Sequence, residues 1–184
     1  MNKSAIISIF FIVNILISCS RTDKRDIDFV PENSQILDMD KSKIVLDDGD
    51  SFEYDGMGIR VLGMDTPEIA HPEHGFFIDQ PYGREAAELT ETIIHNCHEI
   101  SFVKYQEDRY GRMLAHVFID GDLLSIVLIK AGLAYETVSY YGDNGFPELA
   151  QRILEAAEKS KTKDFIPPHQ WRQENRKTPD QVPK

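Results

Sequence analysis

Short apolar runs separated by turn residues predict β-strands in the first part of the chain. The runs lie at 35–40, 43–46, 51–56, 58–64, 99–105 and 112–120. Asp-Gly pairs at the ends of the early runs favour tight hairpins, and the polar segment QEDRYG joins the last two runs. The pattern therefore predicts two groups of strands that follow one another along the chain.

Three other segments have the composition of helices. The first, 82–96, has apolar residues three and four positions apart, and Cys97 continues this face, which assigns the cysteine to the core. The second, 120–132, ends at a glycine, and the third, 146–161, begins with a proline near its start. Strands with one inserted helix and helices afterwards predict an α+β fold, a five-stranded oligonucleotide and oligosaccharide binding (OB) β-barrel with three helices.

The N-terminal segment has the pattern of a secretory signal. Lys3 precedes an apolar run over 5–17 that is short for a permanent transmembrane helix. The LISC sequence that follows resembles the lipobox of bacterial lipoproteins, which implies cleavage after residue 18 and acylation of Cys19. A plain signal peptide or an uncleaved anchor is the alternative. We therefore expect an exported protein that a lipid anchors at the cell envelope, on its periplasmic or extracellular face.

The remaining boundaries follow from changes in composition. Residues 19–33 are polar and without pattern, which predicts a flexible tether that carries the acylated cysteine. The folded domain is expected over 34–164. The tail 165–184 has too many prolines and charges for a packed element. It does contain three apolar residues that can dock on the domain surface, namely Phe165, Ile166 and Trp171.

Composition and charge restrict the class of protein. The 184 residues are 41% hydrophobic and 28% charged, which is ordinary for one soluble globular domain. The formal net charge of -11 excludes the general basic surface of most non-specific nucleic-acid binders. Any polyanionic partner must therefore be bound by local groups. The two cysteines provide no disulfide framework. We expect a monomer.

Three charged clusters stand at the ends of predicted strands. They read DDGDS at 47–51, RVLGMDTPE at 60–68 and EDRYGR at 107–112. Asp50, Asp65 and Glu68 offer the hard oxygen ligands that Ca²⁺ prefers. Arg60 interrupts an apolar strand, where it costs stability unless an anion meets it. Carboxylates and arginines together suit phosphodiester hydrolysis, although each cluster alone is compatible with simple turns and ion pairs.

Taken together and in order, the clusters resemble the motifs of the staphylococcal nuclease (thermonuclease) family of calcium-dependent nucleases. The family pattern begins with Asp-Gly-Asp-Thr, here DGDS, continues through an arginine strand into Asp-Thr-Pro-Glu, and adds Tyr-Gly-Arg, here within RYGR. The resemblance covers residues 44–161, and the tail IPPHQW also looks like bacterial relatives. It implies an OB-fold barrel that hydrolyses DNA and RNA with little sequence preference and leaves 3′-phosphates.

The resemblance also implies a metal site and a base. Asp50 and Asp65 are expected to bind Ca²⁺ through their carboxylates, and Thr66 through its backbone carbonyl. Glu68 is then the general base or the group that orients the attacking water. Pro67 restricts the backbone between these residues and helps to hold the carboxylates in a set relation.

The remaining implied residues contact the substrate. Arg60 and Arg112 are expected to hold the scissile phosphate, and Arg109 and Tyr110 to line the nucleotide pocket. The resemblance leaves a second pocket tyrosine open between two neighbours in a loop that departs from the family pattern, Tyr140 and Tyr141.

Two alternatives to a nuclease remain: an OB-fold module that binds nucleic acid without catalysis, and a surface interaction lipoprotein.

The loop HPEHGFFIDQP bears on substrate affinity, because relatives carry lysines there and this chain has Glu73, His74 and Asp79. We therefore expect weaker association with long nucleic acid than a basic relative would show.

Overall fold

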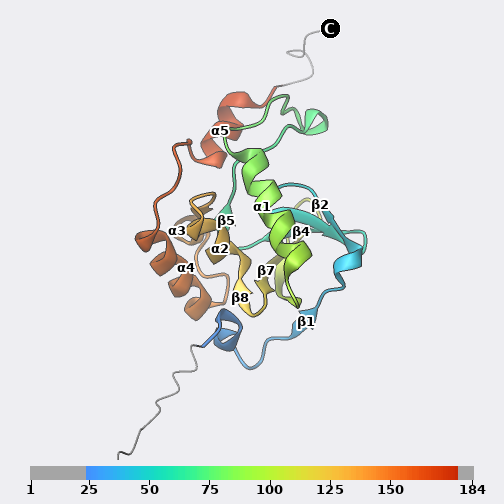
Figure 1. Ribbon diagram of the computed structural model, residues 1–184, viewed down its shortest axis with the longest axis vertical. Coiled ribbons are helices and arrows are strands. Elements are labelled where there is room, and N and C mark those ends of the chain that lie inside the picture. The colour runs from blue at the N-terminus through green and yellow to red at the C-terminus, as the bar shows by residue number, and fades with distance from the viewer. Residues whose placement is uncertain (1–23, 178–184) are drawn as a thin grey trace, which may run out of the picture.

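The structure is a computed structural model that describes residues 24–177 (Figure 1). The predicted signal segment 1–18 and Cys19 lie outside the described residues, as do residues 178–184 of the predicted tail. Among residues 24–177, no helix has the length and the apolar character that crossing a membrane requires.

A curled mixed sheet forms the centre of the fold. Its strands are β1 (Ile36–Asp38), β2 (Ile44–Leu46), β3 (Ser51–Tyr54), β4 (Met57–Val61), β6 (Ile100–Glu107), β7 (Met113–Ile119) and β8 (Asp122–Leu123). The order is β1-β6-β7-β4-β3-β2, and β8 pairs with β7. β4 and β7 run parallel, whereas the other neighbours are antiparallel.

The two ends of this order belong to one stretch of chain. β1 and β2 are separated only by residues 39–43, which include the 3₁₀ turn η2 (Lys41–Lys43). The stretch pairs with β6 at its start and with β3 at its end, so it bridges both edges of the sheet and curls it into a half-closed barrel. The predicted α+β, OB-like fold is confirmed.

Alternation along the strands decides which side chains enter the core. In β4, Ile59 and Val61 are buried, and Arg60 between them points to the opposite face, because successive side chains of a strand alternate. The core also contains Cys97, as the helical pattern predicted. An apolar strand with one charged residue is therefore compatible with a packed barrel, provided that the charged face meets partners.

The three predicted helices are present as α1 (Gly83–Asn96), α2 (Leu124–Lys130) and α4 (Pro147–Lys159). The described residues also form α3 (Val138–Tyr141), α5 (Pro168–Asn175) and the 3₁₀ turns η1 (Asp26–Phe29) and η3 (Pro72–His74). α2 packs between β7 and α4. Figure 1 shows α3 and α4 on one side of the barrel and α5 beside the loop that precedes α1.

The predicted domain start at Ser34 is too late. η1 packs against β8 and α4, and the buried Asp26 accepts a hydrogen bond from the backbone N–H of Leu123 (2.8 Å) and pairs with Arg152. The Arg152 guanidinium also lies 4.4 Å from the ring centre of Phe29. The described part of the predicted tether, residues 24–33, therefore belongs to the folded domain, because the ion pair of a buried carboxylate fixes it there.

The prediction that the tail lacks a packed element is also wrong. Pro168 stands at the start of α5, where its missing N–H costs nothing, so the prolines begin this helix instead of preventing it. Phe165 and Trp171 are buried, whereas Ile166 is exposed. The Trp171 ring packs on Phe76 with 5.7 Å between ring centres. The described tail is therefore docked on the domain.

Candidate active site

The site lies where β4 ends and the chain turns into β5 (Met64–Asp65). β5 pairs with β9 (Tyr135–Glu136), and this pairing fixes Asp65 opposite Tyr135. Asp50 stands just before β3, and its backbone carbonyl accepts from the N–H of Val61 (2.9 Å). Two strand ends that are adjacent in the sheet therefore bring the first two charged clusters of the sequence together.

Arg60 joins the two carboxylates that the sequence assigned to a metal. Its guanidinium pairs with Asp50, and its Nη2 donates to Asp65 Oδ1 (2.6 Å). The other oxygen of Asp50, Oδ2, accepts from the backbone N–H of Thr66 (2.7 Å). The arginine in the apolar strand is thus met by two acids of the same chain, which offsets the cost of its burial.

A second arginine, which the sequence did not identify, enters this cluster from α5. Arg172 Nη1 donates to Asp65 Oδ1 (3.1 Å), its Nη2 donates to Asp65 Oδ2 (2.9 Å), and Nη1 also pairs with Glu68. These contacts join residues more than 100 positions apart (107 for Asp65 and 104 for Glu68). The only local signal was the proximity of Arg172 to the IPPHQW motif.

Gln80 is another residue that the sequence did not identify. It is buried; its Oε1 accepts from the backbone N–H of Glu68 (3.2 Å), and its Nε2 donates to the carbonyl of Ile166 (2.7 Å). The side chain therefore ties the loop that carries Glu68 to the segment that leads into α5.

The cluster carries more negative than positive charge. Its buried acids are Asp48, Asp50, Asp65 and Glu68, and its arginines are Arg60 and Arg172. Four carboxylates and two guanidinium groups leave a formal charge of -2 when all are ionised. Burial raises the pKa of Asp48, Asp50 and Glu68, against the opposing effect of the neighbouring arginines.

A divalent cation suits this donor set. Asp50 and Asp65 offer hard oxygen atoms, and the excess of two negative charges is what one divalent cation neutralises. Within residues 24–177, the buried Oγ1 of Thr66 has no hydrogen-bond partner. The residues present therefore fit a divalent cation, which Asp50, Asp65 and the Thr66 carbonyl would hold.

A further acidic group adjoins this set. Ligand atoms of Asp47, Asp48 and His71 lie within 4.8 Å of one another, and His71 Nε2 is 3.4 Å from Asp47 Oδ1. Asp48 Oδ1 also accepts from the backbone N–H of Asp50 (3.0 Å), so this group supports the turn that positions Asp50.

The third charged cluster of the sequence forms the turn between β6 and β7. Arg112 Nε donates to Asp108 Oδ2 (2.9 Å), and the guanidinium groups of Arg109 and Arg112 lie 4.7 and 5.7 Å from the ring centre of Tyr110. The structure thus brings Arg109, Tyr110 and Arg112 together. Among the described residues, no ion pair joins this turn to Arg60 or Glu68.

The two candidate pocket tyrosines lie on α3. Tyr140 and Tyr141 are exposed, and the Tyr140 ring lies 5.3 Å from the ring of His169, measured between centres. His169 precedes Arg172 by three residues on α5, and this contact places Tyr140 beside the helix that supplies the second arginine. The contact provides a structural distinction between the two tyrosines.

The loop before α1 is held in place by one of its own acids. Asp79 accepts from the backbone N–H of Ala70 (2.8 Å) and pairs with Arg84 (2.6 Å).

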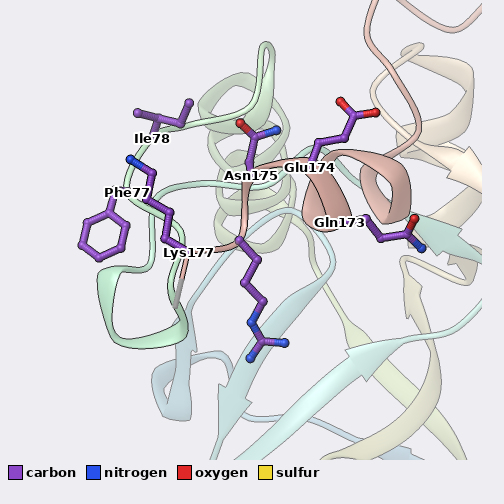
Figure 2. Close-up of a pocket in the computed structure, with 7 residues that line it drawn as sticks. Phe77, Ile78, Gln173, Glu174, Asn175 and Lys177 are labelled. Atoms are coloured by element: carbon purple, nitrogen blue, oxygen red, sulfur yellow. The ribbon is translucent and has the colours of Figure 1, made fainter. Parts of the chain in front are cut away.

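A cavity of about 520 Å³ lies between this loop, at Phe77 and Ile78, and the end of α5, at residues 173–177 (Figure 2). None of its lining residues belongs to the carboxylate cluster.

Comparison with known proteins agrees with this arrangement. The sequence profile described as Staphylococcal nuclease homologue matches residues 58–165. The chain is 33% identical over 120 residues to the thermonuclease of Staphylococcus hyicus, across 62% of this chain and 68% of that protein. It is 34% identical over 92 residues to the thermonuclease of Staphylococcus intermedius, across 47% of this chain and 53% of the relative. Endonuclease YncB of Bacillus subtilis (strain 168) is 36% identical over 93 residues, which are 47% of this chain and 43% of the relative.

Proposed function

This chain belongs to the staphylococcal nuclease family, and on that basis we propose that it is a Ca²⁺-dependent nuclease. It hydrolyses phosphodiester bonds in DNA and RNA with little sequence preference and leaves 3′-phosphates. The observation that carries the proposal is the convergence of Asp50, Asp65, Glu68 and Arg60 in one partly buried cluster with an excess of negative charge. Relatives named as thermonucleases and an endonuclease support the same reaction.

A cation held by Asp50, Asp65 and the Thr66 carbonyl would supply positive charge to the scissile phosphate. Glu68 takes the proton of the attacking water, whose oxygen bonds to phosphorus while the P–O5′ bond breaks. The phosphate stays on the 3′ oxygen, and the departing 5′ oxygen takes up a proton from solvent. Its Oε1 is held by Arg172, and Oε2 has no hydrogen bond within the described part of the chain, so Oε2 is the oxygen that accepts the proton. The pKa of Glu68 is raised by burial, which makes its carboxylate a stronger base than an exposed glutamate.

The two arginines of the sequence motifs stabilise the phosphate. Arg60 is held between Asp50 and Asp65, so its positively charged guanidinium has a fixed position in the cluster. The Arg112 side chain is 38% exposed and paired with Asp108, so it exchanges this partner for a phosphate oxygen when substrate binds. Arg109, Tyr110 and Tyr140 line the path of the nucleotide.

Degradation of single-stranded DNA tests the function. We expect the wild-type chain to degrade it in Ca²⁺ and to stop when a chelator is added. Glu68→Gln should reduce the rate at least about 100-fold, because the amide cannot accept the proton. The matched control is Glu88→Gln on the exposed face of α1, which should keep the wild-type rate. Equal rates for wild type and Glu68→Gln would contradict the mechanism.

The same preparations separate the alternatives. Calorimetry with Ca²⁺ and a nucleoside bisphosphate measures binding independently of turnover. Binding without degradation would identify a non-catalytic OB-fold module, and the absence of both would favour a surface interaction protein.

We also propose that the chain is exported and anchored through acylated Cys19, which lies outside the described residues. The apolar run and the LISC sequence support this. Metabolic labelling with a palmitate analogue should mark the wild-type chain at the membrane fraction. Cys19→Ala should abolish the label, and a labelled Cys19→Ala chain would contradict the anchor.

A further inference from the structure

We propose that Arg172 is a positioning residue of the active site, which the C-terminal helix α5 delivers to hold Glu68 and Asp65 in their reactive relation. The inference rests on the proposed nuclease function. It extends this function to α5, which lies outside residues 58–165, the range that the family profile matches.

The first argument is the geometry of the guanidinium. It binds both oxygens of Asp65, at 2.9 and 3.1 Å, and one oxygen of Glu68. A planar fork that spans two carboxylates fixes both the distance and the angle between them. Glu68 keeps its second oxygen for the water, so the contact orients the base without occupying it.

The second argument is the docking of the segment that carries Arg172. Trp171 is buried against Phe76, and the backbone N–H of Lys177 donates to the carbonyl of Gly75 (2.9 Å). In the segment that precedes α5, the carbonyl of Phe165 accepts a hydrogen bond from the Tyr135 hydroxyl (2.8 Å). Contacts on both sides of Arg172 hold the helix in place, as expected for a residue that positions others.

The third argument is the charge of the cluster. With Arg172 included, the four buried carboxylates and two arginines sum to a formal charge of -2 when all are ionised, which one divalent cation neutralises. Without Arg172 the same set would keep an excess of -1 after the cation binds. Arg172 is therefore the group that brings the charge of this cluster to the value that one divalent cation neutralises.

The experiment uses the full chain with the substitutions Arg172→Gln and Arg172→Lys. We expect Arg172→Gln to lower kcat about 10- to 100-fold, in the range of other groups that orient catalytic ligands, with KM within about threefold of wild type. Arg172→Lys should recover part of the loss, because an ammonium keeps the charge but not the fork. Arg176→Gln is the matched control, since it removes an exposed arginine from the same segment.

Two measurements without turnover complete the test. Trp171 is the only tryptophan of the sequence, so its emission reports whether α5 remains docked. We expect the same emission in wild type and Arg172→Gln. Ca²⁺ binding by calorimetry should be at least as tight in Arg172→Gln, because a positive charge has left the site.

Three results would overturn the inference. An unchanged or higher kcat together with tighter Ca²⁺ binding would make Arg172 a competitor of the cation. A shift of Trp171 emission in Arg172→Gln, with no recovery by Arg172→Lys, would make its role structural. A loss of kcat in Arg176→Gln as large as in Arg172→Gln would make the effect one of general charge. If the wild-type chain itself degrades no nucleic acid, the proposed function fails instead.

Discussion

At the scale of single residues, His116 on β7 is a buried imidazole within the core. Neither ring nitrogen has a hydrogen-bond partner in the described part of the chain, and the ring meets Phe146 edge-on at 5.1 Å between centres. Burial lowers the pKa of His116 from 6.5 to about 4. The unfolded chain therefore takes up this proton first as the pH falls.

The stability of the protein should consequently decrease between pH 6.5 and pH 4. At pH 7 the neutral His116 makes its full contribution to the free energy of unfolding. This free energy has decreased by about 3 kcal/mol when the pH falls to the folded-state pKa of His116. We expect His116→Leu to flatten this part of the curve of unfolding free energy against pH, measured with urea. His95→Gln, an exposed histidine on α1, should leave the curve unchanged. An unaltered slope in His116→Leu would assign the acid sensitivity to other groups.

Arg60 should matter for stability as well as for catalysis. Arg60→Gln leaves the buried Asp50 without its paired cation, whereas Asp65 keeps Arg172, so the loss should be about 3 kcal/mol, the low end for a broken buried pair. Adding Ca²⁺ should restore part of this loss, since a cation bound to the folded state stabilises it. Arg25→Gln breaks an exposed pair with Glu99 and should cost less than about 1 kcal/mol. Equal losses in the two variants would show that the carboxylates do not depend on Arg60.

At the scale of elements, the start of α1 sits directly against the loop that carries Glu68. A Cβ at Gly83 would overlap the carbonyl oxygen of Glu68. Helix propensity alone predicts that Gly83→Ala stabilises α1, because alanine is a better helix former than glycine. The structure reverses the sign, because the methyl group has to displace the backbone of the active-site loop.

We therefore expect Gly83→Ala to unfold at lower urea concentration and to lose about 100-fold in kcat, the effect of a displacement of about 1 Å in a catalytic group. Gly56→Ala adds a methyl group in a hairpin turn where nothing lies within 4 Å, at a positive φ of 81°. It should cost about 1 kcal/mol from backbone strain and leave kcat unchanged. A more stable Gly83→Ala would contradict the close contact.

At the scale of the whole molecule, the charge of -11 should make nucleic-acid binding weak and only shallowly dependent on salt. Two phosphate contacts, by Arg60 and Arg112, correspond to a slope of about -2 in the logarithm of the association constant against that of the salt concentration. Fluorescence anisotropy on duplex DNA measures the slope in the Glu68→Gln background, which prevents cleavage.

The acidic loop provides a direct test of this electrostatic effect. Glu73→Lys should tighten binding and steepen the slope by about 1, because it adds one cation beside the site. Glu158→Lys on α4 changes the net charge equally at a position outside the loop and should have a smaller effect. Identical effects of both variants would show that only the total charge matters.

The sequence alone determined the barrel and identified the acids of the candidate site. Apolar runs and Asp-Gly turns identify the strands because their signals are local, and Asp65, Thr66 and Glu68 lie within four positions of one another in one motif. Helical spacing likewise located α1 and the buried Cys97.

Only the tertiary structure decided which distant groups complete the site. Arg172 and Gln80 act through contacts that no local periodicity records, 107 residues apart for Arg172 with Asp65 and 86 for Gln80 with Ile166. The same holds for Asp26, whose partner Arg152 lies 126 residues away. Prolines and charges made both ends of the domain look unstructured in the sequence, because their order comes from burial against surfaces that exist only after the barrel has folded.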